Sequence, residues 1–203
     1  VFNPKEISVN KSHIDDISLE KSRVEEAKEK SIAQLEEIYE KALKDVGEAN
    51  AQIFEIHIMM LQDDDYNDSI SEIIESEQVN AEYAVSITAK KFAEIFAAAD
   101  DSYMQARAAD VRDISDRMIR NLSSETANDE IINDKVIICA DDLSPSETVS
   151  LDKDKVLAFV TAHGSSNSHT AILARNMNIP AVIGVGEDFL NEVKSGMTAI
   201  ADG

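Results

Sequence analysis

The stretch VLAFVTAHGSSNSHTAILAR, residues 156–175, decides the fold class expected for this chain. Its first five residues form an apolar run with the length and composition of a buried strand. Small polar residues follow, and the helical spacing of apolar residues begins at Ser168 and continues to Met177. A strand, a short loop and a helix in this order are typical of an α/β fold.

The flanking residues continue this alternation. Further runs of strand length are 136–140, 179–183 and 197–201, and short helices are expected at 144–149 and 187–193. Residues 5–9 are expected to add one more strand. We therefore predict a small α/β subdomain over 125–203, to which residues 1–14 contribute a strand.

Residues 15–124 are expected to be helical. Apolar residues recur there at steps of three and four, as at Ile32, Leu35 and Ile38, which indicates helices with one buried face. The expected helices are 18–47, 49–62, a short one around 70–74, 80–98 and 101–122. Short connections between several helices favour an antiparallel bundle. The predicted fold class is α+β or α/β, with the bundle inserted into the α/β subdomain.

The composition of the chain disfavours some classes of function. The chain has 203 residues, 43% of them apolar, and a single cysteine, so it is long enough for a sizeable core and has no internal disulfide. It has no apolar run of about 20 residues and no opening signal peptide, so we expect a cytoplasmic protein with no membrane partner. A net charge of −21 disfavours nucleic acid as a partner. The acid-rich first half would attract a basic protein, although an acidic surface more often serves only solubility.

His169 is the candidate catalytic residue. It stands in the first turn of the helix expected from Ser168, where unsatisfied N–H groups favour an anion. Histidine is a competent covalent nucleophile, and its usual pKa of about 6.5 leaves it largely neutral in the cell. A hydroxyl that accepts the second ring N–H would orient the ring. Thr148 is a candidate for this role, although a threonine at such a position is more often a helix cap or a surface residue.

Several alternatives remain open for this histidine. Ser-His-Thr alone is a weak signal and also fits a hydrolase base or a metal ligand. The chain has no Gly-x-Ser-x-Gly elbow, no His-x-x-x-His and no Cys-x-x-Cys, so we expect no metal site. His163 could line the same pocket, although a loop histidine is usually a surface residue. Cys139 is expected to be a small buried side chain.

Five stretches of the sequence match a known family in order. They read IFEIHIMML at 53–61, RAADVRDI at 107–114, ADDLSPSET at 140–148, HGSSNSHTAILAR at 163–175 and NIPAVIG at 178–184. Together they resemble the N-terminal domain of Enzyme I, the phosphoenolpyruvate-protein phosphotransferase of the bacterial sugar phosphotransferase system. The histidine motif alone also fits pyruvate phosphate dikinase or phosphoenolpyruvate synthase, and the two helical stretches favour Enzyme I.

The resemblance implies a phosphohistidine swivelling α/β subdomain and a phosphoryl-transfer activity. His169 would accept phosphate from phosphoenolpyruvate and pass it to the small carrier protein HPr, with Thr148 orienting its ring. Gly164, Ser168 and Thr170 would belong to the same catalytic loop. Phosphoenolpyruvate and Mg²⁺ would bind a C-terminal domain that this chain does not include, so no cofactor is expected here.

The resemblance also implies that the helical subdomain, 15–124, binds HPr. The positions that match the family's contact surface are Glu48, Glu55, His57, Met59, Met60, Asp63, Asp65, Tyr66 and Arg107.

The chain departs from the family in the catalytic loop. The usual motif reads Gly-Gly-Arg-Thr-Ser-His, whereas this chain has Ser165, Ser166 and Asn167 in place of the second Gly, the Arg and the Thr. The change removes a fixed positive charge beside the phosphate. Ala162 replaces an Asp that is common in the family. A non-catalytic acidic scaffold with an inert histidine therefore stays a third interpretation.

Overall fold

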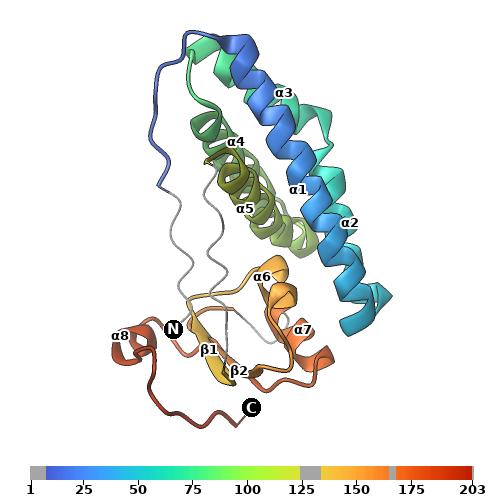
Figure 1. Cartoon of the computed structure of the whole chain (residues 1–203), viewed down its shortest axis with the longest axis vertical. Helices are drawn as coiled ribbons and strands as arrows, with labels where there is room; N and C mark the ends of the chain where they lie inside the picture. Colours follow the sequence, from blue (N-terminus) through green and yellow to red (C-terminus); the bar gives the residue numbers. More distant parts are fainter. Residues whose placement is uncertain (1–7, 124–133, 165–167, 203) are drawn as a thin grey trace. The chain divides into compact units, whose positions relative to one another are not determined.

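The computed structural model describes residues 8–123, 134–164 and 168–202, with the backbone alone at Ser102 and His169 (Figure 1). Contacts between residues divide the chain into two compact units. The bundle unit comprises 6–37 and 53–127, and the sheet unit comprises 1–5, 38–52 and 128–203. The helices α1 and α2 contribute residues to both.

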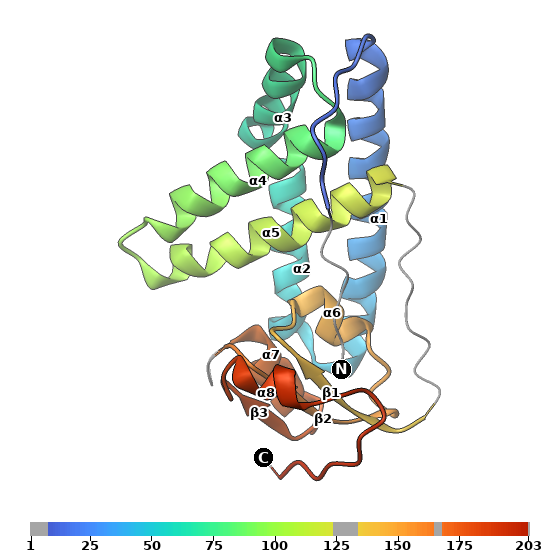
Figure 2. The ribbon, with the colours of Figure 1, turned by 90° about the vertical axis from the view of Figure 1, so that its left-hand side faces the viewer.

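Five helices occupy the first part of the chain. They are α1 (Ile17–Asp45), α2 (Glu48–Leu61), α3 (Asp64–Glu77), α4 (Ala81–Ala97) and α5 (Ser102–Ser123). Within the bundle unit α3 packs on α4, and α4 lies along α5 as a helical hairpin (Figure 2). The side chains buried between these helices are mostly aliphatic: Leu35, Leu61, Ile70, Ile74, Val85, Val111, Ile114 and Met118.

Hydrogen bonds and backbone turns set the boundaries of α3 and α4. Asp63 caps α3, because its carboxylate accepts the backbone N–H of Tyr66 at 3.0 Å. The same helix ends at Gln78, whose backbone is left-handed with φ of 50°. Ser12 and Asn80 then pair through two hydrogen bonds of 2.8 and 3.0 Å, which hold the N-terminal segment at the start of α4.

The sheet unit contains a three-stranded parallel sheet in the order β1 (Val136–Ala140), β2 (Val156–Thr161) and β3 (Ala181–Ile183). The helices between and after the strands are α6 (Pro145–Ser150), α7 (His169–Asn176) and α8 (Asp188–Glu192). The core of this unit is built from Ile138, Ala140, Leu143, Val156, Phe159, Ala174 and Ile179.

The predicted fold class, a helical bundle with a small α/β part, is confirmed. Most predicted elements lie within two residues of the observed ones, but α3 is much longer than the short helix expected around 70–74. The strand predicted at 197–201 is wrong. Met197 and Ile200 are 58% and 96% exposed there, because an apolar run becomes a strand only when its backbone finds a neighbouring strand to pair with.

The structure leaves open the strand expected at 5–9 and the predicted domain boundaries. The strand expected at 5–9 falls mostly outside the described residues, and Ser8 and Val9 are not in a strand. The division into 1–14, 15–124 and 125–203 stays a prediction. Among the described helices, none is both long and apolar enough to cross a bilayer.

Candidate functional site

His169 is the first residue of α7. Ser168 precedes it with an extended backbone, and its hydroxyl accepts the backbone N–H of Ala171 at 3.3 Å. This N-cap places the start of the helix at the predicted residue. The remaining N–H groups of the first turn have no acceptor inside the helix, which favours an anion at this point.

Thr170 anchors the first turn of α7 to the loop that follows β1. Its side chain is buried, and its hydroxyl donates to the backbone carbonyl of Leu143 at 2.7 Å. Leu143 is itself buried in the core of the sheet unit. The backbone of His169 therefore lies between a cap on one side and a buried hydrogen bond on the other.

Gly164 lies three residues after the end of β2 and has φ of +102°, a backbone conformation that residues with a side chain rarely adopt. A Cβ atom at this position would lie 3.0 Å from Cγ2 of Ile183 and 3.6 Å from the hydroxyl oxygen of Ser168. A glycine at position 164 thus lets the end of β2 pass close to both β3 and the start of α7.

We predict that G164A destabilises the sheet unit by about 1–3 kcal/mol, because alanine meets both an unfavourable φ and the methyl group of Ile183. Native-state hydrogen exchange of β2 amides would measure the loss. G196A is the matched control, since Gly196 has φ of +88° but open space around it. An equal loss in both variants would show that crowding against Ile183 contributes nothing.

Thr148 lies in α6, a helix with a complete capping box formed by Ser144 and Glu147. The Thr148 side chain is buried, and its hydroxyl donates to the carbonyl of Ser144 at 2.9 Å. A hydroxyl that donates one hydrogen bond keeps lone pairs with which to accept another. Helix α6 packs against α7, the helix that begins with His169. The role of Thr148 in orienting the His169 ring stays a prediction.

His163 follows β2 and is held between two carboxylates. Its Nδ1 lies 2.8 Å from Oδ1 of Asp141, and its Nε2 lies 3.5 Å from Oε1 of Glu187. The hydrogen bond and the charge of Asp141 raise the pKa of His163 above its usual 6.5. The side chain is half exposed, as a loop histidine would be.

The predicted partner-contact residues fall into two groups in the structure. Exposed side chains are Glu48 in the first turn of α2, Glu55 and Met59 further along it, and Asp63 and Asp65 at the start of α3. Met60 is half-buried. Contacts assign Glu48 to the sheet unit and the others to the bundle unit.

The second group lies inside the bundle unit. His57 and Tyr66 are 0% and 2% exposed, and Arg107 is 8% exposed. The Tyr66 hydroxyl shares a hydrogen bond of 2.7 Å with Ser115, and burial raises the pKa of Tyr66 well above its usual value. Spacing in the sequence did not distinguish these side chains from the exposed ones.

A buried polar cluster connects α2 to α5. Nε2 of His57 lies 3.3 Å from Oδ1 of Asp110, and Arg107 donates to the other oxygen of Asp110 at 2.7 Å. Asp113 approaches Nδ1 of His57 at 3.7 Å. Burial alone would raise the pKa of Asp110, but the close contact with His57 and the hydrogen bond and charge of Arg107 outweigh it and lower that pKa.

Arg107 also contacts an aromatic residue outside the predicted partner-contact set. Its guanidinium carbon lies 4.3 Å from the ring centre of Tyr103. Tyr103 is 59% exposed and Met104 is 37% exposed. The available signal was two adjacent large apolar residues in the first turn of the helix.

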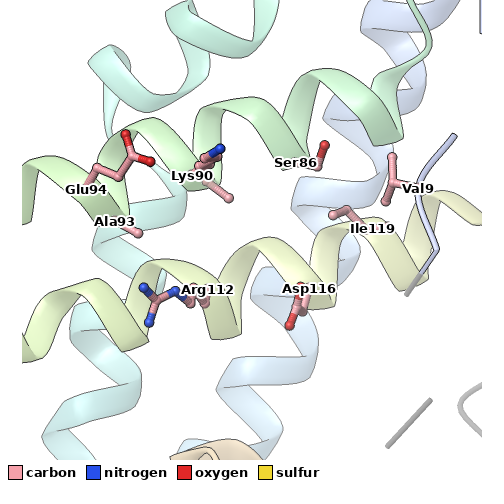
Figure 3. A pocket seen from close by; sticks show the side chains of 9 residues that line it. Val9, Ser86, Lys90, Ala93, Glu94, Arg112, Asp116 and Ile119 are labelled. Atoms are coloured by element: carbon pink, nitrogen blue, oxygen red, sulfur yellow. The ribbon is translucent and has the colours of Figure 1, made fainter. Parts of the chain in front are cut away.

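A cavity of about 570 Å³ lies between α4 and α5, with Lys90 and Arg112 on facing helices (Figure 3). None of the predicted catalytic or partner-contact residues lines it. Its lining also includes Glu94 and Asp116, which offset the two positive charges.

Comparisons with known proteins identify the family of this chain. The family described as "PEP-utilising enzyme, N-terminal" matches residues 1–107, and the one described as "PEP-utilising enzyme, mobile domain" matches residues 132–203. The chain belongs to the PEP-utilising enzymes.

Relatives within the PEP-utilising enzymes specify the branch. Phosphoenolpyruvate-protein phosphotransferases of Priestia megaterium and Bacillus subtilis are each 39% identical to this chain, over 99% and 98% of its length. An NMR solution structure of Enzyme I (nEIt) superposes with a TM-score of 0.74 at 35% identity, covering 90% of this chain and 75% of that one. The N-terminal domain of "Enzyme 1 - Nitrogen" has a TM-score of 0.65 at 28% identity, over 87% of this chain and 72% of that one.

These matches confirm the resemblance to the N-terminal domain of Enzyme I and support it over the dikinase alternative. The chain spans about a third of the length of the curated relatives it matches.

Proposed function

We propose that this chain is a phosphoryl-carrier domain in which His169 accepts a phosphoryl group and passes it to the histidine of HPr. The observation that carries the proposal is the position of His169 as the first residue of α7, between the Ser168 cap and the buried hydrogen bond of Thr170. The names of the relatives supply the chemical class of the reaction. We also propose a cytoplasmic location for this activity.

The proposed step is a transfer between two nitrogen atoms. The free Nε2 of neutral His169 attacks phosphorus, so that a new N–P bond forms as the N–P bond of phospho-HPr breaks, and the HPr histidine leaves with the electron pair. The reverse step runs through the same atoms. Thr148 accepts the second ring N–H and favours the tautomer with Nε2 free, and the first-turn N–H groups of α7 stabilise the phosphoryl oxygens.

We propose that HPr docks on the bundle unit through the exposed residues of α2 and α3, namely Glu55, Met59, Asp63 and Asp65. Apolar Met59 among carboxylates suits a partner surface that is basic and apolar. The buried His57 and Arg107 would act as positioning residues. Their contacts with Asp110 hold α2 against α5 and so position the exposed residues of α2.

We assign phosphoenolpyruvate and Mg²⁺ binding to the part of the relatives that lies beyond the matched third. In the described part of this chain, no three His, Cys, Asp or Glu side chains are arranged to hold a metal ion.

Reverse transfer tests the proposal. The chain is mixed with ³²P-labelled phospho-HPr, and the label it acquires is tested for acid lability. We expect acid-labile label from phospho-HPr and none from phosphoenolpyruvate alone. A folded chain that takes no label from phospho-HPr would contradict the carrier assignment.

M59K tests the docking surface. A lysine in place of this 66% exposed side chain would meet a basic partner, so we expect the rate of label transfer to fall about five- to tenfold, which corresponds to a loss of about 1–1.4 kcal/mol. The matched control is L19K, at an equally exposed apolar position of α1. Equal rates in M59K and the native chain would place the dock elsewhere.

A further inference from the structure

His163 lies where three loops meet at the carboxyl end of the parallel sheet. Asp141 and Asp142 follow β1, His163 and Gly164 follow β2, and Glu187 follows β3. The imidazole contacts Asp141 at 2.8 Å and Glu187 at 3.5 Å. A single side chain thus connects all three loops.

The backbone fixes where this imidazole stands. The N–H of His163 donates to the carbonyl of Asp141 at 2.8 Å, and its carbonyl accepts the hydroxyl of the fully buried Thr161 at 2.7 Å. The turn after β3 is also tied to β2, because the N–H of Gly186 donates to the carbonyl of Ala162 at 3.0 Å. The loops are therefore prearranged, and the imidazole closes the contact between their side chains.

The same place adjoins the start of α7. Gly164, the next residue after His163, lies beside Ser168 and Asp142: a Cβ atom on it would be in van der Waals contact with the hydroxyl of Ser168 at 3.6 Å and with the carboxylate of Asp142 at 3.7 Å. Since Ser168 caps the helix that begins with His169, the turn at His163 lies against the residue that determines where that helix starts.

We propose that His163 is a positioning residue for phosphoryl transfer: its imidazolium ties the loops after β1 and β3 to the end of β2 and so holds the start of α7. This inference rests on the proposed role of His169. Both ring nitrogens face carboxylates, so both must carry a hydrogen to make the two contacts. A neutral imidazole has one N–H and releases one of the two carboxylates.

The tie is consequently sensitive to pH. The groups that face the imidazole are Asp141 and Asp142 from the loop after β1 and Glu187 from the loop after β3. All three are acidic and favour the charged ring, and the pKa of His163 is raised. Its contribution is complete below about pH 6.5, the pKa of an unperturbed histidine, and disappears as the pH rises through the raised value.

NMR titration of the native chain tests the tie without any activity. We expect the amides of Ala171 and Gly186 to shift with the same midpoint as the His163 imidazole, and these shifts to vanish in H163Q. The matched control is H13Q, which removes an exposed histidine near a carboxylate of the bundle unit, 3.8 Å from Asp15. Loop amides that titrate unchanged in H163Q, or that stay flat while His163 titrates, would overturn the proposal.

Transfer from phospho-HPr tests the consequence. The rate of each variant is divided by the native rate at each pH, which cancels the pH effects common to all variants. We expect H163Q to be about two- to fivefold slower at pH 6, as for an exposed ion pair, and to approach the native rate at higher pH. H163K, which keeps the charge, should restore the rate at pH 6 and exceed the native rate at higher pH.

The two proposals fail in different ways. A native chain that takes no label at any pH would refute the carrier function, and the NMR titration would still decide the role of His163. A labelled native chain with H163Q as fast as native at pH 6 would refute the role of His163 alone.

Discussion

Replacing His169 with alanine should lower acid-labile label from phospho-HPr below detection. The substitution removes the nitrogen that forms the new bond to phosphorus, so no slower route through the same atom remains. The backbone features that place this residue, the Ser168 cap and the Thr170 hydrogen bond, do not depend on the imidazole. The α7 helix should therefore persist in H169A, which the amide shifts of 170–176 would report.

H13A is the matched control for H169A. His13 is an exposed histidine of the bundle unit, next to Val79, and its loss should leave labelling unchanged. Persistent label in H169A would move the acceptor to another residue, and His163 would be the first to examine. Loss of label in both variants would indicate a general effect on folding or docking.

Replacing Asp110 with alanine should lower the free energy of unfolding of the bundle unit by about 3–5 kcal/mol, the range for breaking a buried ion pair. Asp110 is fully buried between His57 and Arg107, and its removal leaves a buried guanidinium without its carboxylate. Urea unfolding followed by tyrosine fluorescence would measure the change, since Tyr66 lies in the core of this unit.

Two variants make the Asp110 experiment decisive. D68A removes an exposed carboxylate of α3 and should change stability by less than about 0.5 kcal/mol. D110N keeps an acceptor for Arg107 and is the fallback if D110A does not fold. A loss in D110A no larger than in D68A would show that the buried cluster adds nothing to stability.

The stabilisation that Asp110 gives to the bundle unit changes with pH in the opposite direction to the contribution of His163. The folded-state pKa of Asp110 is lowered, so its contribution is present above the usual carboxyl pKa of about 3.9. It is lost as the pH falls through the lower folded value. In D110N this acid-dependent part of the unfolding free energy should be absent.

The sequence alone determined the elements and the central residue of the site. Apolar periodicity is a local property, so the helices of the bundle and the strands β1 and β2 could be predicted from it. The order strand, small-residue loop and helix was sufficient to place His169 at the first turn of α7. The family followed from several short stretches in the right order, which is also a property of sequence alone.

Only the tertiary structure decided which of these residues face solvent and which pair with one another. His57 and Met59 are two residues apart on α2, yet one is fully buried and the other is 66% exposed, because His57 faces Asp110 of α5 and Met59 faces solvent. The ties of His163 to Asp141 and Glu187 join positions 22 and 24 residues apart, which meet only because the ends of parallel strands gather at one edge of the sheet. The run 197–201 has strand composition but lies unpaired, since pairing depends on a neighbouring strand and not on composition.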